Sequence, residues 1–229
     1  MKKTVVITGA TDGIGRALAI LLSKEYNLAL CGRTEEKMEQ LKGELGDCHV
    51  YTQCFDITDG TKRHDFCEQV KREFGAVDVL VNNAGANTKK DRVTDICLED
   101  LRYMLELNCV SQLGMIQEIY PIMAARKSGL IVNILSTCCL FSNPMTGGYS
   151  AAKDAMEGIS KILTKEAKAD NIGVCSVYPG GVDTNFRAVA NHKYLKPETV
   201  AKMIKHCIEV EEGCVHDIVI RPFIEDNKA

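Results

Sequence analysis

Short apolar runs alternate with longer amphipathic segments along the 229 residues of this chain. Runs rich in β-branched residues, such as Val5-Val6-Ile7, predict buried strands. Segments with apolar residues at helical spacing, such as Ile14, Leu18 and Leu22, predict helices. Strict alternation of the two kinds is typical of a parallel sheet that is covered by helices on both faces.

The pattern predicts seven strands and six helices. The strands are expected near residues 3–8, 28–32, 49–54, 77–82, 129–135, 172–178 and 215–220, and the helices near 14–25, 34–45, 60–74, 98–126, 149–169 and 197–210. Right-handed crossovers then give an α/β fold of the Rossmann type, a doubly wound parallel sheet that binds ligands beyond the carboxyl ends of its strands. No linker or repeat divides the chain, so we expect a single domain over residues 1–229.

Composition limits the function. Lys and Arg total 28 against 31 Asp and Glu, which gives a net charge of −3 and no basic footprint for nucleic acid. The chain passes from two lysines directly into a strand, without a signal-peptide pattern or an apolar run of membrane-spanning length. We therefore expect a cytoplasmic protein whose partners are small molecules, with no membrane contact.

The eleven cysteines are an odd number and include no Cys-x-x-Cys pair. This argues against a disulfide framework and against a zinc ribbon, so we expect reduced thiols and no metal. Cys138-Cys139 follows Ser136 closely and could line a pocket. Adjacent cysteines seldom bridge without strain, so a redox role is not expected.

A glycine-rich turn, Thr8-Gly9-Ala10-Thr11-Asp12-Gly13-Ile14-Gly15, joins the first strand to the first helix. Glycines in this position let the backbone approach a pyrophosphate, and the helix N-terminus supplies unpaired N–H groups. A purely structural turn would explain one glycine, but three before a helix favour phosphate binding.

Tyr149 and Lys153 are separated by one helical turn and project from the same face. A cation ~4 Å from a phenol at an effective dielectric of ~20 contributes roughly 4 kcal/mol, or about 3 pKa units. Such a tyrosine can exchange a proton with a carbonyl or an alcohol. The alternative is a solvated helix face on which the lysine stem covers the ring.

Together these motifs resemble the short-chain dehydrogenase/reductase family, in its small single-domain branch. The resemblance is carried, in the family's order over essentially the whole chain, by Thr8 to Gly15, Asn82-Asn83-Ala84-Gly85, Asn108, Ser136, Tyr149 with Lys153, and Pro179-Gly180 with Thr184. It implies an NAD(P)-dependent oxidoreductase acting on CH–OH groups: a ketone or 3-oxoacyl reductase, or a hydroxy-compound dehydrogenase. The alternative is a coenzyme-binding sensor or regulator with little turnover, although such relatives tend to have lost part of the catalytic tetrad.

The resemblance implies a role for each of four side chains. Tyr149 is the general acid/base, Lys153 lowers the pKa of that phenol and holds the nicotinamide ribose, Ser136 donates to the carbonyl, and Asn108 supports a water relay. Alternatively, Asn108 satisfies backbone groups inside a helix, and Ser136 is an ordinary hydroxyl at a strand end.

Coenzyme contacts are implied in the same way. The expected set is Gly9, Thr11, Asp12, Gly13, Ile14, Gly15, Arg33, Asp56, Ile57, Asn83, Ala84, Gly85, Tyr149, Lys153, Pro179, Gly180, Val182 and Thr184. In the family Asp56 matches an adenine contact, and the backbone of Val182 matches the contact to the nicotinamide carboxamide. Asp56 could equally cap the next helix, and Asn83 to Gly85 could be only a turn.

Arg33 favours NADP(H) over NAD(H). The second strand ends in Gly32-Arg33 without the acidic residue that would bind the ribose hydroxyls of NAD. A guanidinium matches phosphate oxygens bidentately. Asp12 argues the other way, since some NADP-using relatives carry a basic residue in that turn, and Arg33 could be a surface residue at a helix start.

The substrate is not named by the sequence. Only twelve residues separate Thr184 from Pro197, where relatives form a substrate lid, which suggests an open cleft or a small substrate. For assembly, the long helix near 98–126 and the small residues Ala151, Ala152, Ala155 and Gly158 predict a homodimer or homotetramer that pairs these helices, as in the family. The alternative is that the small residues pack on the chain's own sheet.

Overall fold

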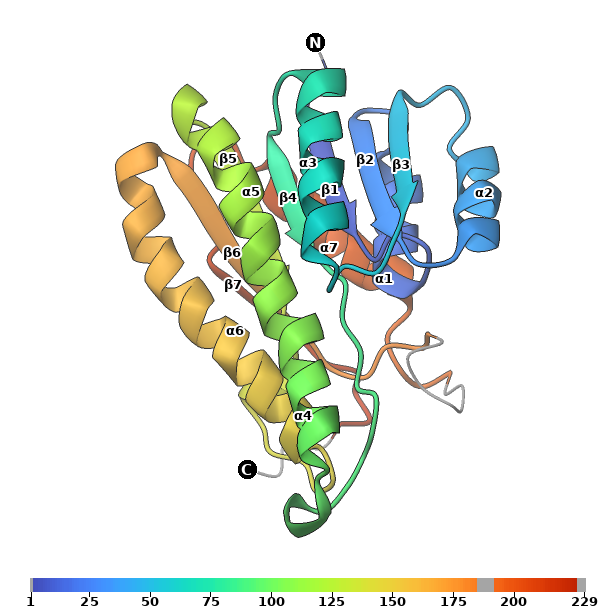
Figure 1. Cartoon of the computed structure of the whole chain (residues 1–229), viewed down its shortest axis with the longest axis vertical. Helices are drawn as coiled ribbons and strands as arrows, with labels where there is room; N and C mark the ends of the chain where they lie inside the picture. The colour runs from blue at the N-terminus through green and yellow to red at the C-terminus, as the bar shows by residue number, and fades with distance from the viewer. Residues whose placement is uncertain (1, 185–191, 226–229) are drawn as a thin grey trace.

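The computed structural model describes residues 2–184 and 192–225, and within them seven parallel strands form one sheet (Figure 1). The strand order is β3-β2-β1-β4-β5-β6-β7. The strands are β1 (Thr4–Thr8), β2 (Asn27–Gly32), β3 (Val50–Cys54), β4 (Val79–Asn82), β5 (Gly129–Ile134), β6 (Ile172–Pro179) and β7 (Asp217–Ile220). The predicted Rossmann-type sheet is confirmed, and its order reverses between β1 and β4.

Seven α-helices cover the two faces of the sheet in the described residues. They are α1 (Gly13–Leu22), α2 (Glu35–Glu44), α3 (Gly60–Phe74), α4 (Leu98–Leu105), α5 (Ser111–Arg126), α6 (Gly147–Glu166) and α7 (Pro197–Glu209). Figure 1 shows α3, α5 and α6 across the face toward the viewer, with α1 and α7 behind the sheet. Both α4 and the start of α6 extend past the carboxyl ends of the strands.

Two apolar cores follow from the two-residue period of the strands. In β1, Val5 and Ile7 pack with α1, α2 and α7, whereas Val6 packs with α3, α5 and α6. In β4, Val79 and Val81 face the first core and Leu80 the second. Both faces of these strands are therefore apolar, which explains why the strands appear in the sequence as continuous apolar runs.

The helix predicted over residues 98–126 is divided in the structure. Between α4 and α5 lies a π-helical segment, Glu106–Val110, in which the Ser111 N–H donates to the Glu106 carbonyl five residues earlier. The apolar pattern of the sequence did not predict this wider turn, because one extra residue leaves a helical period nearly intact. Such turns are frequent at functional sites, and this one contains Asn108.

Three structural findings concern the membrane, the cysteines and metal ligands. No helix among the described residues is both long and apolar enough to cross a membrane. All eleven cysteines are free. In residues 2–184 and 192–225 no three His, Cys, Asp or Glu side chains gather as metal ligands would.

Candidate active site

The glycine turn between β1 and α1 has little room for side chains. Gly9 and Gly13 have positive φ values of 64° and 51°, which L-residues rarely adopt. A Cβ on Gly15 would lie 2.5 Å from both the Asn83 Nδ2 and the Gly9 carbonyl oxygen, and one on Gly13 would lie 3.1 Å from the Thr184 methyl group. The turn therefore requires glycine at all three positions, and Thr184 lies against it.

Asn83 ties the glycine turn to the end of β4. Its Nδ2 donates to the carbonyl oxygens of Thr8 and Gly9 at 2.9 and 3.1 Å. The Thr8 hydroxyl oxygen accepts from the backbone N–H groups of Asn83 and Ala84 at 3.0 and 2.9 Å. These bonds cross the point where the strand order reverses, so the expected coenzyme residues 83–85 lie beside the turn.

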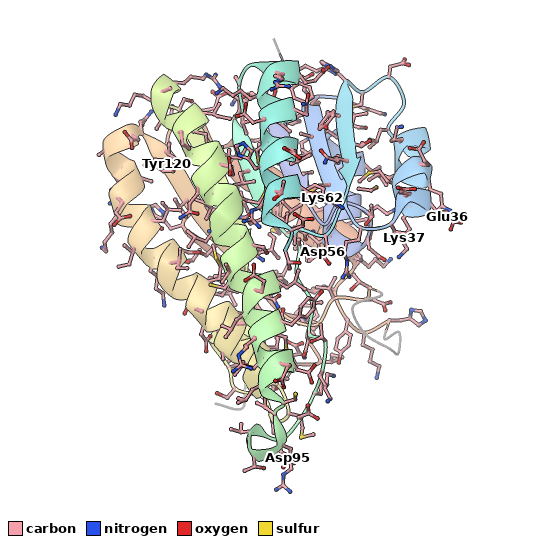
Figure 2. The ribbon with its side chains drawn as sticks, viewed as in Figure 1. Glu36, Lys37, Asp56, Lys62, Asp95 and Tyr120 are labelled. Carbon is pink, nitrogen blue, oxygen red and sulfur yellow. The ribbon has the colours of Figure 1, made fainter. Side chains whose placement is uncertain are left out.

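Asp12 caps α1 and also pairs with a lysine that the sequence analysis missed. Its Oδ1 accepts from the Gly13 N–H at 2.8 Å, and its Oδ2 lies 2.5 Å from the Lys37 Nζ. Lys37 is four residues after Arg33, at the start of the predicted helix. Helical spacing could therefore have identified Lys37 as a second cation near Arg33. The Lys37 ammonium partly neutralises the Asp12 carboxylate. Lys37 lies at the carboxyl end of the sheet, as does Asp56 (Figure 2).

Arg33 and Asp56 follow neighbouring strands. The guanidinium of Arg33 is mostly exposed and lies 3.9 Å from Asp56 Oδ2. Asp56 Oδ1 accepts from the N–H and the hydroxyl of Thr58, whereas Asp59 is the residue that caps α3. The capping alternative considered for Asp56 therefore belongs to Asp59. Ile57 is buried in the second core, so only its backbone can face a ligand.

The remaining residues of the turn face inward. Thr11 is buried and fills the space that a side chain on Gly32 would need. Ile14 is only partly buried and packs on the first core. Thr11 thus lies against the end of β2, and Gly15 lies against Asn83 at the end of β4.

Tyr149 and Lys153 share one face of α6, as predicted. The Lys153 Nζ lies 6.0 Å from the centre of the Tyr149 ring, and it donates to the Ile134 carbonyl oxygen at 2.8 Å. Ile134 ends β5, two residues before Ser136, whose hydroxyl oxygen accepts from the Cys138 N–H at 3.2 Å. The lysine therefore connects the helix that carries the phenol to the strand that leads to the serine hydroxyl.

Lys153 is buried, with 3% of its surface exposed. Burial lowers the pKa of this ammonium from its usual 10.5 to about 8, although the nearby thiols of Cys138, Cys139 and Cys109 act in the opposite direction. A Cβ on Gly85 would lie 3.3 Å from the Lys153 Nζ. The ammonium thus lies directly beneath the loop that follows β4.

Asn108 is fully buried in the π-helical segment. Its Nδ2 donates to the carbonyl oxygens of Ala86 and Met104, both at 2.9 Å, and its Oδ1 accepts from the Ala86 N–H at 3.2 Å. Both amide hydrogens are engaged with backbone, which agrees with the alternative considered for this residue. Its oxygen would lie 2.6 Å from a Cβ on Gly85, so Asn108 holds this loop close to Lys153.

The turn after β6 is held by the C-terminal segment. Gly180 donates its N–H to the Ile220 carbonyl at 2.8 Å, and the Gly181 N–H donates to Glu225 Oε1 at 2.6 Å. Arg221 pairs with Glu225 at 3.2 Å and stacks over the Phe141 ring at 4.2 Å. No local pattern in the sequence indicated these contacts.

Val182 is nearly buried and forms an isolated bridge with Leu195. Pro179 ends β6 beside Ile220. Of the segment between Thr184 and Pro197, residues 185–191 lie outside the described part of the chain, and the expectation of an open cleft there stays a prediction. Gln112, a buried residue that the sequence analysis missed, donates from Nε2 to the Ala84 carbonyl at 2.7 Å.

Comparison with known proteins gives one consistent family. The family model described as short chain dehydrogenase matches residues 3–195. An uncharacterised oxidoreductase of Staphylococcus aureus strain USA300 is 30% identical over 96% of this chain and 97% of its own. The NADPH-dependent pterin aldehyde reductase of Arabidopsis thaliana is 30% identical over 80% of this chain and 76% of its own.

Solved structures agree. An alcohol dehydrogenase from the archaeon Thermococcus sibiricus, complexed with 5-hydroxy-NADP, superposes with a TM-score of 0.92 at 25% identity over 100% of both chains. A serine dehydrogenase complexed with NADP+ gives a TM-score of 0.93 over 99% of this chain and 97% of its own, and at 24% identity that match bears on the fold alone.

The buried ammonium of Lys153 makes stability depend on pH. Between its folded pKa of about 8 and its usual 10.5 the unfolded chain binds more protons, so the free energy of unfolding rises with pH. Relative to Lys153→Met, the coenzyme-free wild type should gain about 1.5 kcal/mol between pH 8 and pH 9.5 in urea unfolding. The exposed Lys161, on the same helix, gives the control variant Lys161→Met. Equal pH slopes for wild type and Lys153→Met would contradict a buried ammonium.

Proposed function

The chain belongs to the short-chain dehydrogenase family, and we propose that it is an NADP(H)-dependent oxidoreductase that transfers a hydride between nicotinamide and a carbonyl or alcohol carbon of a small substrate. One observation carries the proposal: the Lys153 ammonium lies on the helix face of Tyr149 and is hydrogen-bonded to the end of the strand that leads to Ser136. A phenol, an ammonium and a hydroxyl then lie together at the carboxyl end of the sheet, where this fold binds ligands.

The glycine turn fits a dinucleotide. Side chains are excluded at Gly9, Gly13 and Gly15, which keeps the backbone open to a pyrophosphate at the N-terminus of α1. We propose the coenzyme set of the sequence analysis for this chain: the turn for the pyrophosphate, residues 83–85 along the nicotinamide half, and Lys153 for the nicotinamide ribose. The segment Pro179 to Val182, with Thr184, is proposed to face the carboxamide.

Arg33 and Lys37 support NADP(H). Arg33 directly follows β2 and Lys37 lies in the first turn of α2, near where the adenosine ribose is proposed to bind, and the carboxylate of Asp12 is already paired with Lys37. The complexes of the archaeal alcohol dehydrogenase and of the relative ElxO, at 25% identity each, contain 5-hydroxy-NADP and NADP. Because the Lys37 ammonium pairs with Asp12, the acidic residue in the glycine turn no longer argues against NADP(H).

The residues of this chain then divide the work on the carbonyl group. The coenzyme, when bound, supplies or accepts the hydride. The Ser136 hydroxyl donates to the carbonyl oxygen, on which negative charge develops, and Tyr149 donates its phenolic proton to the same oxygen. Lys153 stabilises the phenolate that remains. In the direction of alcohol oxidation, Tyr149 accepts the proton instead.

Asn108 is proposed as a positioning residue within this set. Its side-chain hydrogens are both engaged with Ala86 and Met104, so it acts by keeping the loop after β4 over Lys153. The resemblance implies a water relay at Asn108. Such a relay would have to use the side-chain or backbone carbonyl oxygen of Asn108, because both Nδ2 hydrogens are already engaged.

A coenzyme-binding sensor is the alternative from a different functional class.

We also propose that residues 1–229 act as a single coenzyme-binding domain in the cytoplasm. The free state of all eleven cysteines supports a reducing compartment. The proposed substrate is a ketone, a 3-oxoacyl thioester or a hydroxy compound, and an activity assay distinguishes these classes.

Tyr149→Phe should lower turnover at least ~100-fold, because the ring keeps its volume but loses the transferable proton. NADPH oxidation at 340 nm with a panel of small aldehydes, ketones and 3-oxoacyl thioesters measures this, and thermal shifts with NADPH report coenzyme binding, which should persist. Tyr103→Phe, on the exposed side of α4, is the control. A variant that keeps more than about a tenth of the rate would refute the role of Tyr149. A wild type that binds NADPH without turning over any carbonyl would favour the sensor.

Lys37→Met should weaken NADPH binding about tenfold and leave NADH binding nearly unchanged, because a charge-assisted contact to the 2′-phosphate is worth about 1.5 kcal/mol. Calorimetric titration gives both dissociation constants. Lys42→Met serves as the control, since Lys42 lies on the same helix but pairs with Glu39. Arg33→Asp should shift preference toward NADH. Equal affinity of the wild type for NADPH and NADH would sink the proposed preference.

The outer face of α5 and α6 supports a homodimer or homotetramer. An apolar groove between these helices is lined by Leu113, Ile116, Ala155, Ile159 and Ile162, and Ile162 is 56% exposed. Ala151 and Gly158 are exposed and a Cβ on Gly158 would meet nothing within 4 Å, whereas Ala152 is fully buried and packs inward. The expected small-residue face therefore consists of three residues and not four.

Light scattering at 10 µM should report at least twice the 25.2 kDa chain mass. Gly158→Glu places a charge in the proposed helix contact and should lower that mass. Val210→Asp, at the end of α7 on the opposite face of the sheet, should not. A wild-type monomer at every concentration would exclude the assembly and leave the catalytic proposal intact.

A further inference from the structure

The segment that follows β7 lies against the turn after β6. The Gly180 N–H donates to the Ile220 carbonyl oxygen at 2.8 Å, and the Gly181 N–H donates to Glu225 Oε1 at 2.6 Å. A Cβ on Gly180 would collide with Glu225 Oε2 and would lie 3.0 Å from Pro222 Cδ. Glycine at position 180 therefore leaves room for a carboxylate that comes from a distant part of the chain.

Gly181 is also held by the segment that precedes α7. The Leu195 N–H donates to the Gly181 carbonyl oxygen at 2.9 Å, and the Asp183 N–H donates to the Leu195 carbonyl oxygen at 2.8 Å. In this parallel bridge the hydrogen bonds go to the two neighbours of Val182, so the N–H and C=O of Val182 itself point away from Leu195. These are the backbone groups that are proposed to face the nicotinamide carboxamide. Their direction depends on how the adjacent Gly181 peptide is held.

The carboxylate that holds Gly181 has a cation as its second partner. Glu225 Oε2 lies 3.2 Å from Arg221 Nε, and the two side chains are 22% and 17% exposed. Hydrogen bonds to an ionised group that is largely removed from water are stronger than those of exposed groups. The Arg221 guanidinium also lies over the Phe141 ring, 4.2 Å from its centre. Phe141 lies in the sequence between Ser136 and Tyr149, so the ion pair connects the turn after β6 to the loop between these two residues.

We infer that Glu225 is a positioning residue for the nicotinamide half of the coenzyme. Its carboxylate fixes the Gly181 peptide, and thereby the direction of the Val182 backbone groups. Arg221 keeps that carboxylate in place. The inference rests on the proposed function, because it requires the coenzyme to bind at this turn.

The two halves of the coenzyme separate this role from a general effect on the fold. The adenosine half is proposed to bind near Arg33 and Lys37, beside the end of β2, and in the sheet the strands β1, β4 and β5 lie between β2 and β6. A residue that acts through the turn after β6 should affect the whole coenzyme and not an adenosine fragment. A general loss of structure should weaken the binding of both.

Glu225→Ala should weaken NADPH binding about tenfold, the effect of losing one charge-assisted hydrogen bond, and should leave binding of adenosine 2′,5′-bisphosphate unchanged. Calorimetric titration of the full-length protein gives both dissociation constants. Arg221→Met should also weaken NADPH binding. Added to Glu225→Ala, it should cause no further loss, because Arg221 acts through Glu225. Glu212→Ala, at an exposed position before β7, is the control and should change neither constant.

Equal losses for NADPH and for the adenosine fragment, or an NADPH affinity that Glu225→Ala leaves unchanged, would overturn the inference while wild-type binding of NADPH leaves the proposed function intact. If Glu225→Ala does not fold, Glu225→Gln keeps the volume and one acceptor but loses the pairing with Arg221. A larger loss for NADPH than for the fragment in that variant supports the inference, and equal losses overturn it. A wild type that binds neither ligand would refute the proposed function and the inference together.

Discussion

The buried ammonium of Lys153 is the interaction on which the arrangement of the site depends. An ammonium with 3% of its surface exposed is costly to bury, and the Ile134 carbonyl gives it a fixed partner at 2.8 Å. That bond joins α6 to the end of β5. Gly85, which has no side chain to occupy the space, lets the loop after β4 approach the same nitrogen. The Lys153 ammonium thus connects α6 to the end of β5 and to the loop that follows β4.

The same end of the sheet is held on its other side by amides. Asn83 spans β1 and β4 through the carbonyls of Thr8 and Gly9, and Asn108 spans the π-helical segment and the loop after β4. Each of these side chains satisfies backbone groups that a parallel sheet leaves open where its strands diverge. The coenzyme turn and the catalytic helix are therefore positioned by a network of buried polar groups around a space where the strand order reverses.

Charges around the glycine turn have a double use. Asp12 caps α1 and also accepts Lys37, while Arg33 and Asp56 face each other across the ends of β2 and β3. These pairs are partly exposed, so they contribute little to stability. Their importance lies in the electrostatic potential that they create at the edge where a 2′-phosphate is proposed to bind. Lys153 is a further charged group, buried deeper in the site.

The sequence determined the elements, because apolar periods and glycine spacing are local. It identified the parallel sheet, the glycine turn and the shared face of Tyr149 and Lys153, and the family resemblance arranged these in one order. It did not reveal the π turn at Asn108, since an added residue barely disturbs an apolar pattern. It also left Asp56 open as a possible cap of the next helix, although Asp59 is the residue that caps α3.

Contacts between distant segments were decided only by the tertiary structure. Lys37 reaches Asp12 from α2, and Glu225 holds Gly181 from the C-terminal segment. On α6, Ala152 is buried while Ala151 and Gly158 are exposed. Burial and the pKa values that follow from it depend on which surfaces pack together, and the identity of a residue does not contain that information.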